Sequence, residues 1–459
     1  MKVSKFGGTS LAGADQIRKV CSIVTSDPER RLVVVSAPGK RYRDDTKVTD
    51  MLIACAQACL KNGTAEKELD CVLSRYAEIT QELGLPGEII NTISDDISTR
   101  LKADMSNKEA YMDSLKAAGE DNCAKLVAAY MQKDGINAQY INPGDAGLLL
   151  SNEYGNAQVL PESYHKLECL KNMPGITIFP GFFGYSQNGE VVTFSRGGSD
   201  ITGSILAAAV DADLYENFTD VDCVYAVNPN IIYNPQPIYE FTYREMRELS
   251  YAGFSVFHEE ALVPVYRKGI PVSIKNTNNP GAPGTTISLR RENIARPVVG
   301  IAGDSGFCSI YINKYLMNRE VGFGRKILHI LEGENISYEH IPSGIDNMSV
   351  ILKENHFTKA IEDRIIERIK SELAADDVTV QHNLALIMVV GEGMQHTIGV
   401  AARITAALSR ASVNIEIINQ GSTEVSMMLG VNADDRIKAV KALYAEFFTD
   451  EKNKAADSV

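Results

Sequence analysis

Lys5-Phe-Gly-Gly-Thr-Ser10 is the most informative stretch of this sequence. A lysine ends a short extended run, and the glycine pair Gly7-Gly8 and two hydroxyl residues follow it. Paired glycines let backbone N–H groups approach an anion closely, and a lysine adds a point charge for phosphate oxygens. The stretch is not a Walker A loop, because its lysine precedes the glycines. It predicts an anion-binding turn between a strand and a helix, and the alternative is an ordinary turn with a surface lysine.

A second cluster, Phe194-Ser-Arg-Gly-Gly-Ser-Asp200, also places glycines before an apolar helix. Arg196 offers a planar fork that suits a carboxylate. Asp200 has the chemistry to hold Lys5 or to order a metal–water shell. The alternative is a helix N-cap at Ser199 or Asp200 beside an incidental arginine.

A third cluster, Asn217-Phe-Thr-Asp-Val-Asp222, follows the strand-like run 214–218. In an open α/β sheet, ligands bind beyond the carboxyl ends of the strands. We therefore expect Thr219, Asp220 and the nearby Tyr225 to line a nucleotide, although a plain polar turn would read the same way.

The surrounding sequence predicts an α/β fold. Apolar, strand-like runs occur at residues 3–6, 32–35, 175–179, 191–194 and 214–218. Helical patterns occur at 14–24, 48–60, 64–83, 108–134 and 200–212. Continuous apolar strands that alternate with helices indicate a mostly parallel sheet covered on both faces.

The remainder of the chain contains a diverged repeat. Residues 335–341 resemble 414–419, and each follows a helix (321–332 and 397–410). Each also precedes a strand (349–352 and 426–429) and a second helix (358–373 and 434–447). The first unit has a final strand at 378–381, but the second has none.

The strand 298–302 is left over, so we expect it to complete the second unit, with the first unit inserted in the second. We predict a first domain at 1–294 and a first repeat unit at 304–383. The second repeat unit is discontinuous and combines 297–303 with 384–449, and a polar tail follows at 450–459. The turn-rich stretch 276–285 and a composition shift at 293–297 mark the first boundary.

Composition narrows the function classes. The 459 residues carry a net charge of -13, which disfavours general binding to nucleic acid or to a membrane surface. No apolar run approaches the ~20 residues of a membrane helix, and the first residues lack a signal peptide, so we expect a cytoplasmic protein. The eight scattered cysteines predict reduced core residues and no metal site.

At these clusters the sequence resembles aspartokinase, a family of the amino-acid kinase superfamily. The resemblance rests on residues 5–10, on Gly184, Gly189 and Thr193, and on 196–200; the repeat resembles paired ACT modules. It implies a three-layer amino-acid kinase fold followed by two βαββαβ modules. The implied reaction transfers the γ-phosphoryl group of ATP, with Mg²⁺, to the β-carboxylate of L-aspartate.

The resemblance also implies roles for single residues. The catalytic set is Lys5, Gly7, Gly8 and Asp200, and the substrate set is Ser36, Thr49, Glu120 and Arg196. The ATP-binding set adds Thr219, Asp220, Tyr225, Asn230, Ser255 and Val256 to Lys5, Gly7 and Gly8. No residue is assigned as a direct metal ligand. Two positions depart from the family, because many members carry an arginine where this chain has Asn230 and a lysine where it has Ser255.

For regulation, the resemblance implies an amino-acid effector, expected to be L-lysine, in the first ACT-like module. The implied effector residues are Met317, Glu320, Phe323, Gly324, Ser337, Tyr338 and Glu339. It also implies a homodimer or a dimer of dimers through these modules, and a monofunctional enzyme. Two alternatives stay open: a catalytically silent amino-acid sensor or regulatory subunit, and a kinase of the same fold for another acid.

Overall fold

The computed structural model describes residues 1–195, 197–254, 259–291, 294, 296–421 and 425–449. The chain divides into two compact units. Unit 1 comprises Met1–Val224, Pro237–Arg247 and Ser255–Glu292, and unit 2 comprises Tyr225–Gln236, Glu248–Phe254 and Asn293–Val459. Unit 2 thus takes two segments that the sequence-based boundary at 294 assigned to the first domain. The polar tail at 450–459 lies outside the described residues.

Unit 1 is built on an eight-stranded sheet with the order β11-β13-β12-β8-β1-β2-β5-β3. Every neighbouring pair is parallel except β12 and β13. The strands are β1 (Lys2–Phe6), β2 (Arg30–Val35), β3 (Ala138–Tyr140), β5 (Ile176–Pro180), β8 (Leu214–Thr219), β11 (Glu240–Thr242), β12 (Val272–Asn276) and β13 (Thr285–Ser288).

Two small sheets accompany it. One joins β4 (Leu149–Leu150), β6 (Phe183–Ser186) and β7 (Val191–Thr193), and the other joins β9 (Val224–Tyr225) and β10 (Pro237–Ile238). The expected strand at 191–194 therefore exists as β7, but it lies in a small sheet.

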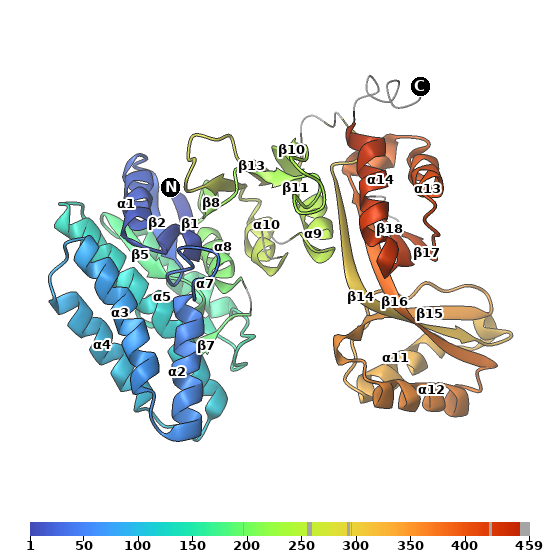
Figure 1. Cartoon of the computed structure of the whole chain (residues 1–459), viewed down its shortest axis with the longest axis horizontal. Coiled ribbons are helices and arrows are strands. Elements are labelled where there is room, and N and C mark those ends of the chain that lie inside the picture. The colour runs from blue at the N-terminus through green and yellow to red at the C-terminus, as the bar shows by residue number, and fades with distance from the viewer. Residues whose placement is uncertain (196, 255–258, 292–293, 295, 422–424, 450–459) are drawn as a thin grey trace. The chain divides into compact units, whose positions relative to one another are not determined.

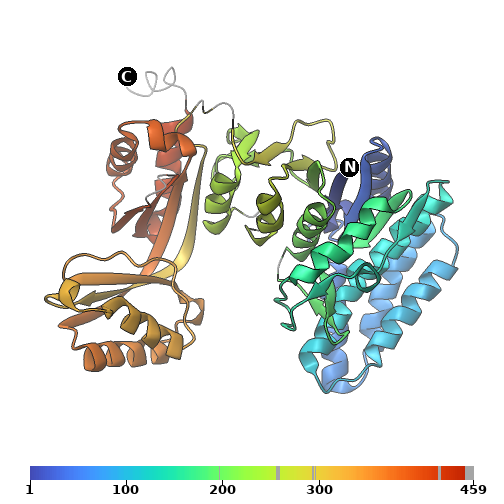
Figure 2. The ribbon, with the colours of Figure 1, turned by 180° about the vertical axis from the view of Figure 1, so that it is seen from behind.

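Helices cover both faces of the main sheet. Val33 and Val35 of β2 pack into an apolar core with five helices: α1 (Ala14–Thr25), α2 (Val48–Asn62), α3 (Glu66–Glu82), α4 (Glu88–Leu101) and α5 (Lys108–Lys133). Leu32 and Val34 alternate with these valines and face the opposite side, where α8 (Gly198–Ala209) contacts β1, β2 and β8. Figure 2 shows the blue and cyan helices α2 to α5 side by side.

Four shorter helices complete unit 1: α6 (Pro143–Ala146), α7 (Pro161–Leu167), the start of α9 (Tyr243–Tyr251) and α10 (Leu262–Lys268). Helix α4 was absent from the sequence-based expectation. Its β-branched Ile and Thr residues weaken intrinsic helix propensity, and the helix instead forms because Ile93, Ile97 and Leu101 are buried in the core.

Unit 2 contains a five-stranded antiparallel sheet with the order β15-β14-β16-β18-β17. Its strands are β14 (Gly300–Asn313), β15 (Asn347–Lys353), β16 (Asp377–Val390), β17 (Ile417–Gln420) and β18 (Ser426–Asn432). Its helices are α11 (Phe323–Gly333), α12 (Lys359–Leu373), α13 (Val400–Arg410) and α14 (Arg436–Phe448).

The long strands β14 and β16 run through both halves of this sheet (Figure 1). Residues 300–305 pair with 385–390, and residues 309–313 pair with 377–381. The strand predicted at 298–302 thus lies beside the end of β16, which is the pairing that the insertion hypothesis requires. The exact module boundaries stay predictions.

One expected strand is irregular. Residues 335–341 form only an isolated bridge, between His340 and Ile351, whereas the corresponding β17 is a regular strand. One local feature accounts for this difference: Pro342 has no N–H to donate to a ladder.

The structure can be compared with the predictions for the cysteines and for membrane-spanning helices. Six of the eight free cysteines are buried, but Cys71 and Cys169 are exposed, so the prediction of core cysteines was wrong for these two. They lie on the solvent faces of α3 and of the short 3₁₀ turn Glu168–Asn172. Within the described part of the chain, no helix combines the length and the apolar character needed to cross a membrane.

Candidate functional site

A pocket of about 420 Å³ opens in unit 1 where β1 and β2 end and α8 begins. Such a position, beyond the carboxyl ends of parallel strands, is typical of ligand sites in open α/β sheets. The pocket brings together seven of the residues predicted for the catalytic and substrate-binding sets, which are Lys5, Gly7, Gly8, Ser36, Thr49, Glu120 and Asp200.

Lys5 and Asp200 form the polar centre of this pocket. Lys5 Nζ lies 2.6 Å from Asp200 Oδ1, and the two side chains are only 9% and 15% exposed. Asn217 Nδ2 donates to the same oxygen at 2.7 Å. Asp200 is in the first turn of α8, where the helix dipole also favours a carboxylate. The ammonium group of Lys5 is therefore held in one place at the pocket wall.

The glycines allow the backbone to come close at this point. Gly39 N donates to Gly8 O at 2.8 Å, and a Cβ on Gly39 would lie 2.5 Å from the carbonyl carbon of Gly8. A Cβ on Gly7 would lie 3.5 Å from Lys5 Nζ. Side chains here would occupy the space beside the lysine, so the glycines keep the turn that we predicted to bind an anion open.

Glu120 is the most buried ionisable residue of the pocket. It lies on α5, is buried, and its Oε2 has no hydrogen-bond partner in the described part of the chain. Burial raises the pKa of Glu120 to about 8, although a backbone hydrogen bond from Ala37 and the charge of Lys5 oppose this shift. The carboxyl group is therefore mostly protonated at neutral pH, and it is ready to ionise beside a cationic group.

Other predicted ATP-binding residues lie elsewhere or outside the described residues. Thr219 ends β8 and its hydroxyl donates to Asp220 Oδ1 at 3.3 Å, but neither residue lines the described pocket. Tyr225 and Asn230 belong to unit 2. The structure does not describe Arg196, Ser255 and Val256.

Two lysines of the pocket were not predicted from the sequence. Lys47 precedes α2, and Lys116 is one helical turn before Glu120 on α5. Lys116 Nζ lies 3.1 Å from Asp113 Oδ1, and the other oxygen of Asp113 accepts hydrogen bonds from Gly155 N and Thr193 N. The i, i+4 spacing of Lys116 and Glu120 is a signal that could have revealed this lysine.

The predicted effector residues of unit 2 fall into two groups. Ser337 and Tyr338 line an open pocket of about 720 Å³ along α11. Met317 and Phe323 are buried in the core of the first module, and Gly324 is in the first turn of α11. Among the described residues that line this pocket along α11, Met317, Phe323 and Gly324 are absent.

Glu320 and Glu339 already have partners. Glu320 pairs with Lys314 and Lys326, each at 2.6 Å, and these lysines lower its pKa. Glu339 accepts a hydrogen bond from the hydroxyl of Tyr251, also in unit 2. An effector ammonium at Glu320 would therefore have to compete with two lysines.

Comparison with known proteins agrees with this architecture. The amino acid kinase family model matches residues 1–276, and an ACT domain model matches residues 387–447. Aspartokinase 3 of Bacillus subtilis is 62% identical over 448 residues, which cover 98% of this chain and 99% of that protein.

Solved structures give the same result. The aspartate kinase of Clostridium acetobutylicum matches with a TM-score of 0.83 and 40% identity, over 97% of this chain and all of that one. Escherichia coli aspartokinase III matches at 25% identity over 98% of this chain and all of that one. Its TM-scores are 0.80 for the R-state complex with aspartate and ADP and 0.73 for the T-state complex with lysine and aspartate. The chain therefore belongs to the aspartokinase family of amino acid kinases.

Proposed function

We propose that this chain transfers the γ-phosphoryl group of ATP to the β-carboxylate of L-aspartate, forming 4-phospho-L-aspartate and ADP, and that an amino acid regulates it through the ACT modules. The observation that carries the catalytic half is the Lys5–Asp200 pair in one pocket with the buried carboxyl of Glu120. The relatives named above support the choice of substrates.

The chemistry requires positioning more than proton transfer. The β-carboxylate of aspartate is ionised at neutral pH, so it needs no general base to act as a nucleophile. The difficulty is to bring two anions together, and fixed cations and backbone N–H groups provide this in phosphoryl transfer. Lys5 and the turn at Gly7 and Gly8 neutralise and orient the phosphates in this proposal.

The substrate is oriented by its two α-substituents. The carboxyl of Glu120 receives the α-ammonium, and Arg196 receives the α-carboxylate. Ser36 and Thr49, which line the same pocket, provide further polar contacts. A β-carboxylate oxygen of aspartate forms a bond to the γ-phosphorus of ATP. The bond between that phosphorus and the oxygen bridging to the β-phosphate breaks, so ADP and the acyl phosphate are the products.

The donor set is compatible with Mg²⁺, which proteins hold through one or two carboxylates and the substrate phosphates. Lys5 and Asn217 both contact Oδ1 of Asp200, which leaves Oδ2 without a hydrogen bond among the described residues. We assign Asp200 as the residue that would hold Mg²⁺ through its water shell. When bound, the ion neutralises charge on the phosphate oxygens.

L-lysine is the effector in this proposal, since it is bound in the T-state structure of the E. coli relative. Assembly through the ACT modules and a cytoplasmic location belong to the same proposal.

The test is ADP release by the purified chain with Mg-ATP and L-aspartate, with the acyl phosphate trapped by hydroxylamine. We expect aspartate-dependent hydroxamate, no product with L-glutamate, and suppression by L-lysine. Lysine binding without hydroxamate would refute the catalytic assignment in favour of a sensor. Hydroxamate with glutamate in place of aspartate would refute the substrate assignment.

A further inference from the structure

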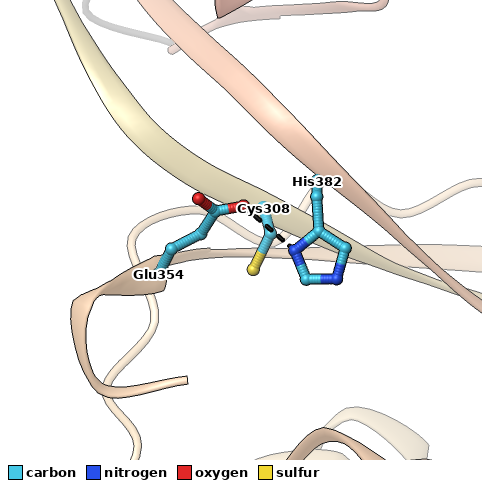
Figure 3. A group of neighbouring side chains, drawn as sticks. All are labelled: Cys308, Glu354 and His382. Carbon is cyan, nitrogen blue, oxygen red and sulfur yellow. Dashed lines mark hydrogen bonds and ion pairs between the residues drawn. The ribbon is translucent and has the colours of Figure 1, made fainter. Parts of the chain in front are cut away.

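Three side chains with metal-binding atoms meet in the first module of unit 2. They are Cys308 on β14, Glu354 in the short 3₁₀ turn Glu354–His356, and His382 on β16 (Figure 3). One ligand atom from each, the sulfur, a carboxylate oxygen and an imidazole nitrogen, lies within 4.8 Å of the other two. Figure 3 shows the carboxylate and the ring facing each other across the sulfur.

A β-bulge produces this meeting. Ser309 pairs with Gln381 and Phe307 pairs with Leu384, so His382 and its successor oppose the single residue Cys308. Asn383, the successor, has a positive φ of 60°, and its N–H donates to Glu354 Oε1 at 3.2 Å. Bulges re-aim side chains, and here the bulge turns the imidazole toward the thiol and the carboxylate.

A second carboxylate supports the ring from its other side. His382 Nδ1 lies 3.0 Å from Glu354 Oε1, and Nε2 lies 3.0 Å from Oε2 of the buried Glu362 on α12. Metal-binding histidines almost always donate their other ring N–H to such an acceptor, which fixes the tautomer. Glu362 is itself held by Lys359 at 2.6 Å.

We propose that Cys308 Sγ, His382 Nδ1 and the Glu354 carboxylate bind a divalent transition metal of the zinc class, with Glu362 orienting the imidazole. Thiolate, imidazole and carboxylate are the three ligand types that Zn²⁺ takes, and water completes a tetrahedral set. On binding, the thiol of Cys308 loses its proton to solvent and the sulfur forms the metal bond. The ion would then tie β14, β16 and the 3₁₀ turn together at the junction of the two halves of the sheet.

The site can be tested on the reduced, chelator-treated full chain with Co²⁺ as a spectroscopic probe and Zn²⁺ as a competitor. We expect one Co²⁺ per chain, a thiolate-to-cobalt charge-transfer band, intense tetrahedral d–d bands, and displacement by Zn²⁺. Cys308→Ser should abolish the charge-transfer band. Glu362→Gln should weaken binding by roughly 10- to 100-fold, the range for outer-shell partners.

Matched controls separate this site from surface binding. Cys71→Ser removes an exposed thiol, and His329→Gln removes an exposed histidine that pairs with Glu332 at 3.2 Å, so both should leave binding unchanged. Because Cys308 is fully buried, His382→Gln, at a half-exposed ring, is the second test should the serine variant fail to fold.

Absence of the charge-transfer band in the wild-type chain would overturn the proposal. A band that survives both Cys308→Ser and His382→Gln would overturn it as well. In either case the cluster has a structural role only, in which His382 links the carboxylates of Glu354 and Glu362 by hydrogen bonds.

Discussion

Binding of L-aspartate should release a proton from Glu120. In the free enzyme burial raises the pKa of this carboxyl to about 8, so about nine-tenths of the molecules carry the proton at pH 7. An ammonium group beside Glu120 favours the ionised form and drives the proton off. We therefore expect about 0.9 protons released per aspartate bound at pH 7 and nearly none at about pH 9, below the range where the α-ammonium of free aspartate itself loses its proton.

The same coupling sets the pH dependence of affinity. Each pH unit below 8 should weaken aspartate binding about tenfold, because the ligand must compete with the proton for the carboxylate. Affinity therefore rises with pH and levels off above 8. The sign is opposite to that expected for a carboxyl with a lowered pKa, which would be ionised throughout this range.

Isothermal titration calorimetry in buffers of different ionisation enthalpy measures the released protons directly. Glu120→Gln should bind more weakly, with a heat that no longer depends on the buffer. Asp50→Asn, a second carboxyl of the same pocket, should still release the proton. A binding heat that is independent of the buffer in the wild-type chain at pH 7 would rule out this coupling.

Three further outcomes are expected. Lys5→Ala should lower kcat by ~10²- to 10³-fold, as loss of a group that stabilises transition-state charge does, while lysine binding by calorimetry stays intact; near-normal turnover would remove Lys5 from the catalytic set. Arg30→Ala should lower the free energy of unfolding in urea by about 2 kcal/mol at pH 7, because the buried Glu216 loses its contacts with Arg30 at 2.7 and 3.0 Å and keeps those with Lys275 and Ser4. Burial raises the pKa of Glu216, but Arg30, Lys275 and Ser4 together lower it by more, so this stabilisation is present above pH 4.5 and is lost as pH falls; a loss that is constant down to pH 3 would contradict the assignment. Glu320→Ala should raise the lysine concentration needed for half-inhibition without lowering the maximal rate, and an unchanged inhibition curve would place the effector elsewhere.

Local patterns predicted much of unit 1. Lys5 with its glycines, and Asp200 at a helix start, each stand out within a few residues of sequence, because strand ends and helix starts have their own residue preferences. Apolar periodicity also predicted the four neighbouring strands β8, β1, β2 and β5 and the helices α1, α2, α3, α5 and α8, whereas the short helices α6, α7, α9 and α10 were missed. Helix α4 was missed because burial of Ile93 and Ile97 compensates for its weak propensity.

Other features depend on tertiary contacts that no local pattern contains. Glu120 lies on a helix that is buried nearly all round, so its role came from the family resemblance and its raised pKa from the fold. Cys308, Glu354 and His382 come from three segments, and only the register shift between β14 and β16 brings them together. Cysteine spacing along the chain could not have revealed that group.

If Glu120 binds substrate as proposed, the charges of this pocket give its carboxyl group a second role. Three lysines and three carboxyl residues line the described pocket, so formal charges would cancel. With Glu120 protonated at neutral pH, however, the described lining carries an excess of one positive charge, which favours entry of the anionic substrates. In the proposed binding mode the carboxyl ionises as the α-ammonium arrives, so the negative charge forms where a cation pairs with it. A permanently ionised Glu120 would instead repel both the phosphates and the β-carboxylate before the substrate is in place.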